Sequence, residues 1–211
     1  DLVAASPAAA KVFQRHKLDY CCGGKQSLEE ACTAEHLDAD AVLRELAAAE
    51  ASSEDEVRWA ESPIDQLIQH ILDRYHAPLR TELPRLVELA RRVERVHADK
   101  PDRPQGLADL LVEVHAAVES HLAKEEKLLF PLILSGRGPM AHMPVQVMIQ
   151  EHEDHGQNLR RIRELTKDLK LPDYACASWR ELYRALGERE VALMDHIHLE
   201  NNILFPRALA G

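Results

Sequence analysis

The stretch His121-Leu-Ala-Lys-Glu125-Glu-Lys-Leu-Leu-Phe130-Pro131 decides the fold, because its pattern recurs near the end of the chain. The second copy is His196-Ile-His-Leu-Glu200-Asn-Asn-Ile-Leu-Phe205-Pro206. In both copies a His and a Glu stand four positions apart, which places both side chains on one face of a helix. Imidazole and carboxylate together suit a first-row transition metal such as iron, and the Phe-Pro pair is expected to end the helix. The repeat therefore predicts two metal-binding helices.

The composition is that of an ordinary globular protein built from helices. The chain has 211 residues, of which 45% are hydrophobic and 29% charged, and strand-like alternation is not evident. A net charge of −10 argues against a nucleic-acid partner. No apolar run approaches the roughly 18 residues of a membrane span, and the four cysteines match no zinc framework. We therefore expect an all-α protein of the reducing cytoplasm, with neither membrane nor nucleic acid as partner.

Two parts are expected along the chain. Residues 1–58 read as a small helical unit, with helix starts at Ser6-Pro7 and at the capping box Ser27-Leu-Glu-Glu30. Between these two starts lies a Cys21-Cys22-Gly-Gly loop. A polar, acidic linker follows, and residues 59–211 carry the repeat.

Four long helices are expected in this second part, and an up-down-up-down four-helix bundle is the economical way to pack them. The first helix contains Pro78 and Pro84, each of which should remove one backbone hydrogen bond and bend it. The expected ranges begin near residues 62, 107, 144 and 178.

Spacing adds two further ligands to the repeat. His76 precedes His121 by nearly the distance that separates His152 from His196. An internal repeat of helix pairs would therefore bring four imidazoles to one centre.

The ligand count then selects the type of site. Four histidines with Glu125 and Glu200 exceed the needs of one tetrahedral zinc ion. They suit two metal ions bridged by both carboxylates, with two histidines on each. We thus expect two Fe ions per chain, joined by an oxo or hydroxo bridge, since two carboxylates leave ferric charge uncompensated.

The remaining polar residues near the repeat receive lesser expectations. Glu151 is expected just outside the ligands, where a carboxylate can orient a histidine or relay protons. His155 is expected to be solvated. No role is assigned to His97, His198 or Cys176.

The chain resembles a known family along nearly its whole length. The resemblance rests on three motifs: Asp19-Tyr-Cys-Cys-Gly-Gly-Lys25, Glu94-Arg-Val-His97-Ala-Asp-Lys-Pro101 and, near the end of the chain, Leu199-Glu-Asn-Asn-Ile-Leu-Phe-Pro206. These are similar to the iron–sulfur cluster repair di-iron proteins, the RIC or YtfE/ScdA type. The resemblance implies a hemerythrin-like bundle whose iron ligands match the same six residues.

The resemblance also implies a function. Such proteins restore iron–sulfur clusters damaged by nitric oxide or oxidants, so the implied partners are damaged iron–sulfur proteins or apo cluster scaffolds, with NO or O2 as small molecules. Cys21 and Cys22 match the family's cysteine pair, which implies thiol-assisted iron transfer. A dimer is compatible with the sequence.

Three other interpretations stay open at this point. The protein could be a di-iron enzyme that reduces nitric oxide, and the sequence does not decide between an enzyme and an iron donor. It could also be a hemerythrin-like module that binds O2 or exchanges electrons. A structural bundle without metal is the simplest alternative.

Overall fold

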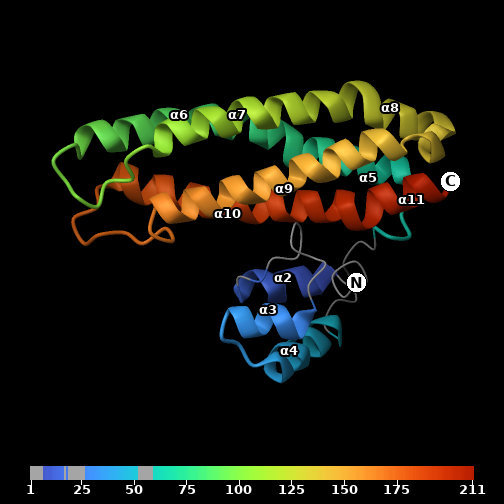
Figure 1. Cartoon of the computed structure of the whole chain (residues 1–211), viewed down its shortest axis with the longest axis horizontal. Coiled ribbons are helices and arrows are strands. Elements are labelled where there is room, and N and C mark those ends of the chain that lie inside the picture. The colour runs from blue at the N-terminus through green and yellow to red at the C-terminus, as the bar shows by residue number, and fades with distance from the viewer. Residues whose placement is uncertain (1–6, 17, 19–26, 52–58) are drawn as a thin grey trace.

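The chain folds into helices and loops throughout the residues that the computed structural model describes, which are 7–16, 18, 27–51 and 59–211. Four long rods lie side by side, and a group of short helices packs beneath them (Figure 1). No strand occurs in these described ranges. The prediction of an all-α four-helix bundle preceded by a small helical unit is therefore confirmed.

The short helices are α2 (Pro7–Arg15), α3 (Leu28–Ala34) and α4 (Ala39–Ala51). The capping box at the start of α3 is present: the Ser27 hydroxyl accepts from the Glu30 amide, and the Glu30 carboxylate accepts from the Ser27 amide at 2.8 Å. At the start of α4, Asp38 accepts from the Asp40 amide at 3.0 Å. The unit has its own apolar core, against which Met194 of the bundle packs.

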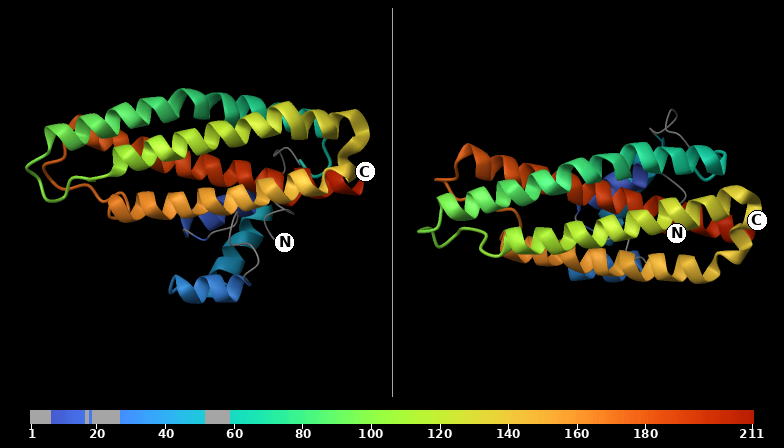
Figure 2. Two further views of the ribbon diagram at one scale, coloured as in Figure 1. Left: turned by 45° about the horizontal axis from the view of Figure 1, so that its top comes forward. Right: turned by 90° about the horizontal axis from the view of Figure 1, so that it is seen from above.

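Three of the four long rods consist of consecutive helical segments, and the third rod is a single helix. The first rod comprises α5 (Ile64–Ile71), η1 (Leu72–His76) and α6 (Ala77–Val96), and the second α7 (Leu107–Lys124), η2 (Glu125–Leu129), α8 (Phe130–Leu132) and η3 (Ile133–Arg137). A short 3-10 turn, η4 (Gly138–Met140), leads to the third rod, α9 (His142–Leu165). The fourth comprises α10 (Ala177–Leu199), η5 (Glu200–Leu204) and α11 (Phe205–Ala210). Figure 2 shows the four rods from two further directions.

The segments η1, η2 and η5 are π-helical turns, and each ends two residues before a proline. Proline has no amide hydrogen, and its ring collides with the carbonyl four residues back. In all three rods the residue before the proline donates five residues back instead, to the carbonyls of Leu72, Glu125 and Glu200. The wide turn accommodates the ring. The expectation that Phe-Pro ends the helix is therefore wrong, because α8 and α11 continue beyond it.

Two apolar layers fill the bundle and leave a polar layer between them. One layer lies toward the loops 97–106 and 166–176 and includes Leu86, Leu111 and Trp179. The other lies toward the C-terminus and includes Leu67 and Phe205. The π turns begin or end where these layers meet. The predicted ligands therefore lie inside the bundle, enclosed by core on both sides.

Two glycines provide a test of the packing at the end of the bundle. A methyl group at Gly138 would overlap the backbone carbonyl oxygen of Ala208, which cannot move away cheaply. We expect Gly138→Ala to lower the free energy of unfolding by about 2 kcal/mol or more. Gly187 lies within α10 and its added methyl would meet only the Leu169 side chain at 3.4 Å. Gly187→Ala should therefore raise stability by about 0.5–1 kcal/mol, both measured by urea unfolding.

Candidate metal centre

Four imidazoles meet in the polar layer, one from each rod. His76 closes η1, His121 lies in α7, His152 in α9 and His196 in α10, and none is more than 2% exposed. Two fully buried carboxylates join them. Glu125 and Glu200 each lie four positions after a histidine of the same rod, on the same helical face, and they are the first residues of the π turns η2 and η5.

The six side chains form two groups that share both carboxylates. The Nε2 atoms of His76 and His196 lie 3.1 Å apart, and those of His121 and His152 also lie 3.1 Å apart. The Glu125 carboxylate lies 3.4 Å from His76 and 3.5 Å from His121. Glu200 likewise lies 3.2 Å from His152 and 3.0 Å from His196. Each carboxylate thus contacts one histidine of each pair.

Metal ions would satisfy these buried ligand atoms better than hydrogen bonds among the six side chains do. Both oxygens of Glu125 and one of Glu200 are buried without a hydrogen-bond donor among the described residues. An unpaired buried carboxylate is costly, and so is the close approach of two of them. Within each group the ligating atoms lie inside 4.8 Å of one another, a spacing that a cation can occupy. The cluster is capable of binding metal.

Burial sets the protonation of these groups. Burial, and next the neighbouring His196, lower the pKa of His76 to about 4. Burial and His152 lower the pKa of His121 to about 2. Both imidazoles are thus neutral at pH 7, the form that ligates metal. Burial and the Glu200 carboxylate raise the pKa of Glu125 well above its ordinary value, so without a cation the carboxylate pair retains a proton.

Three of the four histidines are held from outside through Nδ1, which leaves Nε2 free to face the centre. His76 Nδ1 donates to Glu126 at 2.9 Å, His121 to Glu151 at 2.9 Å and His152 to the Asn201 side-chain oxygen at 2.8 Å. Glu151, expected just outside the candidate ligands, thus contacts one of them. Such partners fix ring orientation and raise the basicity of the ligand.

Sequence reasoning missed Glu126 and Asn201, although the repeat contained a signal for both. Each directly follows a candidate bridging glutamate, and each holds the histidine of the preceding rod. The guanidinium of Arg80 in turn donates two hydrogen bonds to the Glu126 carboxylate, at 2.7 and 3.1 Å. Although burial raises it, the hydrogen bonds from Arg80 and His76 bring the pKa of Glu126 below its ordinary value.

The two halves of the centre differ in their surroundings. His121 is held by Glu151, which also pairs with Lys124. In the corresponding place beside His196 stands Tyr75, whose ring stacks on that imidazole with centroids 5.4 Å apart. No described residue accepts a hydrogen bond from His196 Nδ1. The corresponding histidines thus differ, with a charged outer contact at His121 and an aromatic one at His196, while His76 keeps a charged partner in Glu126.

His155 differs from its expectation. It is 4% exposed and lies edge-on to His121 with ring centroids 5.0 Å apart, so the prediction of a solvated histidine is wrong. Position i+3 from His152 turns it toward the same interior. Burial and next His152 lower its pKa to about 4. Cys21 and Cys22 lie outside the described residues.

Comparisons with known proteins agree with this geometry. Residues 67–208 match the family described as "Hemerythrin HHE cation binding domain", and residues 1–50 match a "Domain of Unknown function (DUF542)". The chain is 46% identical to the iron–sulfur cluster repair protein YtfE of Dickeya chrysanthemi, covering 100% of this chain and 96% of that one. It is 47% identical to the YtfE protein of Cronobacter sakazakii, covering 100% and 95%.

Fold and site together define a hemerythrin-type bundle, an α-helical protein with a histidine- and glutamate-lined metal site. The family resemblance expected from the sequence is confirmed. Given near-complete coverage at this identity, the chain belongs to the YtfE family of iron–sulfur cluster repair proteins. None of the described helices combines the length and apolarity that crossing a membrane would require.

The depressed histidine pKa values predict how the metal-free protein responds to acid. At pH values below about 6.5, the ordinary histidine pKa, His76, His121 and His155 bind protons in the unfolded chain. In the folded chain they stay neutral until lower pH, because burial lowers their pKa values. The free energy of unfolding should therefore fall between about pH 6.5 and pH 4, by about 1 kcal/mol or more per histidine. Chemical denaturation of the chelator-treated protein at several pH values measures this. A flat profile would contradict the buried, neutral imidazoles.

The outer contact at His76 gives a second test. Glu126→Gln removes the charge that accepts from Nδ1 while keeping the side-chain shape. We expect metal affinity to fall by about 10-fold or more, because outer partners of ligating histidines have effects of that size. Glu113→Gln is the matched control, an exposed glutamate on α7 paired only weakly with Arg161 at 3.4 Å. Competition with a chromogenic chelator measures the metal affinity of both variants. Equal affinities of the two variants would contradict a role for Glu126 in metal binding.

Proposed function

We propose that this protein repairs damaged iron–sulfur clusters and does so by donating iron held in the bundle. The observation that supports it is the pair of four-residue groups sharing Glu125 and Glu200. His76 and His196 would hold one iron ion, His121 and His152 the other, and the two carboxylates would bridge. The name of the relatives, iron–sulfur cluster repair protein, supports this process. Damaged iron–sulfur proteins of the bacterial cytoplasm, or apo cluster scaffolds, are the proposed clients.

When bound, two iron ions would supply redox-active metal whose attraction to the carboxylates weakens on reduction. The chain's own residues determine how such metal could leave. All six candidate ligands are buried, whereas Glu126 and Glu151 are 27% and 24% exposed at their side chains. These two carboxylates contact ligand histidines on one side and solvent on the other. They are therefore placed to receive protons or outgoing cations.

The division into two parts belongs to the same proposal. We assign residues 1–58 to a unit that carries Cys21 and Cys22 for thiol-assisted transfer, and residues 59–211 to the iron-holding bundle. Separate apolar cores support the division, as do the separate family matches at 1–50 and 67–208.

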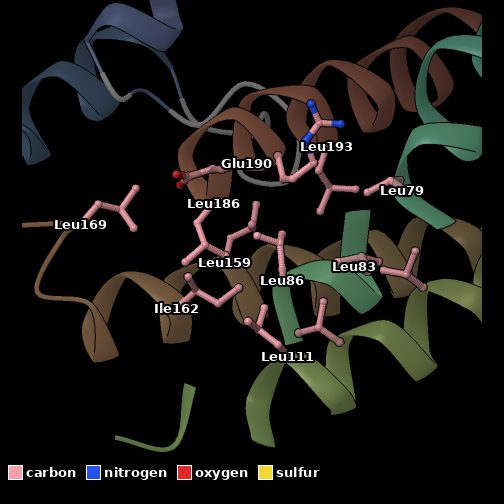
Figure 3. Close-up of a pocket in the computed structure, with 13 residues that line it drawn as sticks. Leu79, Leu83, Leu86, Leu111, Leu159, Ile162, Leu169, Leu186, Glu190 and Leu193 are labelled. Atoms are coloured by element: carbon pink, nitrogen blue, oxygen red, sulfur yellow. The ribbon is translucent and has the colours of Figure 1, made fainter. Parts of the chain in front are cut away.

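A specific feature favours a second candidate, a di-iron enzyme that reduces nitric oxide. An apolar cavity of about 40 Å³ lies in the core one helical turn beyond the histidines. Leu79, Val118 and Leu193 line it, each three positions from a candidate ligand, and leucines from all four rods point into it (Figure 3). Such a space suits a small, weakly polar gas such as NO or O2.

Metal content and repair measured on the same preparations test the proposal. We expect about two irons per chain, and loss of repair of a nitric oxide-damaged iron–sulfur enzyme when both Cys21→Ser and Cys22→Ser are introduced. The double variant should keep its iron, because the bundle supplies the ligands. Glu200→Ala should lose iron and repair together, since it removes a carboxylate common to both groups.

The outcomes separate the candidates. Full repair by the double cysteine variant would contradict thiol-assisted transfer. Catalytic consumption of nitric oxide by iron-loaded protein with a reductant, without iron loss, would favour the enzyme. Reversible O2 binding without repair would favour a binding module. Purified protein with no iron under iron-replete expression would overturn all three metal-based functions.

A further inference from the structure

A cysteine and a histidine meet at the end of the bundle opposite the metal centre. His97 Nε2 lies 3.2 Å from Cys176 Sγ, so the thiol can donate to the imidazole. The two residues come from different rods, since His97 follows α6 and Cys176 precedes α10. About 20 helical residues, roughly 30 Å, separate them from His76 and His196. The pair is therefore independent of the metal site.

Two helix ends of opposite polarity converge on this pair. His97 is the C-terminal cap residue of α6, a helix of 20 residues, and Cys176 is the N-terminal cap residue of α10, a helix of 23 residues. The negative end of a helix dipole stabilises a cation and the positive end stabilises an anion. Both ends thus favour transfer of the thiol proton to the imidazole, which would leave imidazolium beside α6 and thiolate beside α10.

The surroundings hold the histidine and leave the sulfur partly accessible. His97 is only 9% exposed and its ring lies against the buried indole of Trp179, with centroids 4.9 Å apart. Cys176 is partly exposed. The Arg180 guanidinium adds positive charge nearby, because it donates to the Ala175 carbonyl at 3.1 Å, one residue from the cysteine. Cys32 offers the opposite case, a fully buried thiol whose pKa is raised by burial.

We propose that Cys176 and His97 form a nucleophilic pair that reacts with low-molecular-weight disulfides, making Cys176 a site of reversible mixed-disulfide formation. His97 takes the thiol proton, and the Cys176 sulfur attacks one sulfur of the small disulfide. The new protein S–S bond forms as the old S–S bond breaks. The released thiolate takes the proton from His97. One protein thiol is oxidised and half of the small disulfide is reduced, so no other oxidant is required.

Glutathione disulfide is the probe for the full-length protein, with each cysteine followed separately by peptide mass spectrometry. We expect Cys176 of the folded wild type at pH 7 to react at least about tenfold faster than the same residue in urea-unfolded protein. The Cys32 peptide should stay unmodified in the folded chain. His97→Gln should slow Cys176 by about tenfold or more, while His115→Gln, on a partly exposed histidine of α7, should leave its rate unchanged.

A pH series separates proton transfer from mere access to the sulfur. At pH 10 solvent ionises ordinary thiols, so His97→Gln and wild type should then react at similar rates. A loss of equal size at pH 7 and pH 10 would overturn the role of His97 as base. A folded-state rate no faster than the unfolded one would overturn the whole proposal. Repair activity of the metal-loaded protein is a separate readout and does not enter this test.

Discussion

Two carboxylates placed together in a dry interior constrain the whole bundle. Glu125 and Glu200 are fully buried, and three of their four oxygens have no hydrogen-bond donor among the described residues. The imidazoles of His76 and His121 cannot compensate the carboxylate charge as imidazolium, because burial lowers their pKa values. The carboxylates therefore gain no balancing positive charge from these two histidines, and the six side chains attract a metal cation strongly. Metal binding is therefore the condition under which this polar layer becomes favourable within an apolar core.

Three of the rods accommodate a proline beside this polar layer. A regular α-helix carrying proline would lose a hydrogen bond and suffer a ring collision, and the π turn relieves both in three of the rods. In the second and fourth rods the π turn starts at a glutamate whose amide still donates to the carbonyl of the histidine four positions earlier, so regular helical spacing turns Glu125 and Glu200 inward. The Phe-Pro tail of each repeat also borders the site, because the Phe130 and Phe205 rings stack on His76 and His152 with centroids 5.8 and 6.0 Å apart.

Sequence periodicity was sufficient for the rods, the repeat and the convergence of the six side chains, because each depends on spacing along a helix. It was insufficient for Glu126, Asn201 and Tyr75, whose importance depends on which residue of the neighbouring rod they meet. His155 shows the same limit: position i+3 from His152 permits an inward direction, but its burial depends on the contact with His121 of α7, which spacing within α9 does not supply. Similarly, Phe-Pro signals a helix end locally, whereas packing of the following segment keeps the helix going.

The outer contacts explain how a repeated bundle can have unequal halves. In the repeat, Glu151 before His152 corresponds to Tyr75 before His76. The first accepts from His121 and makes that ligand more basic, whereas the second stacks on His196 and leaves its Nδ1 without a described acceptor. An ion on the His76 and His196 side would thus have one less strongly donating ligand. The inequality lies at His196, because His76 of the same half is held by the Glu126 carboxylate.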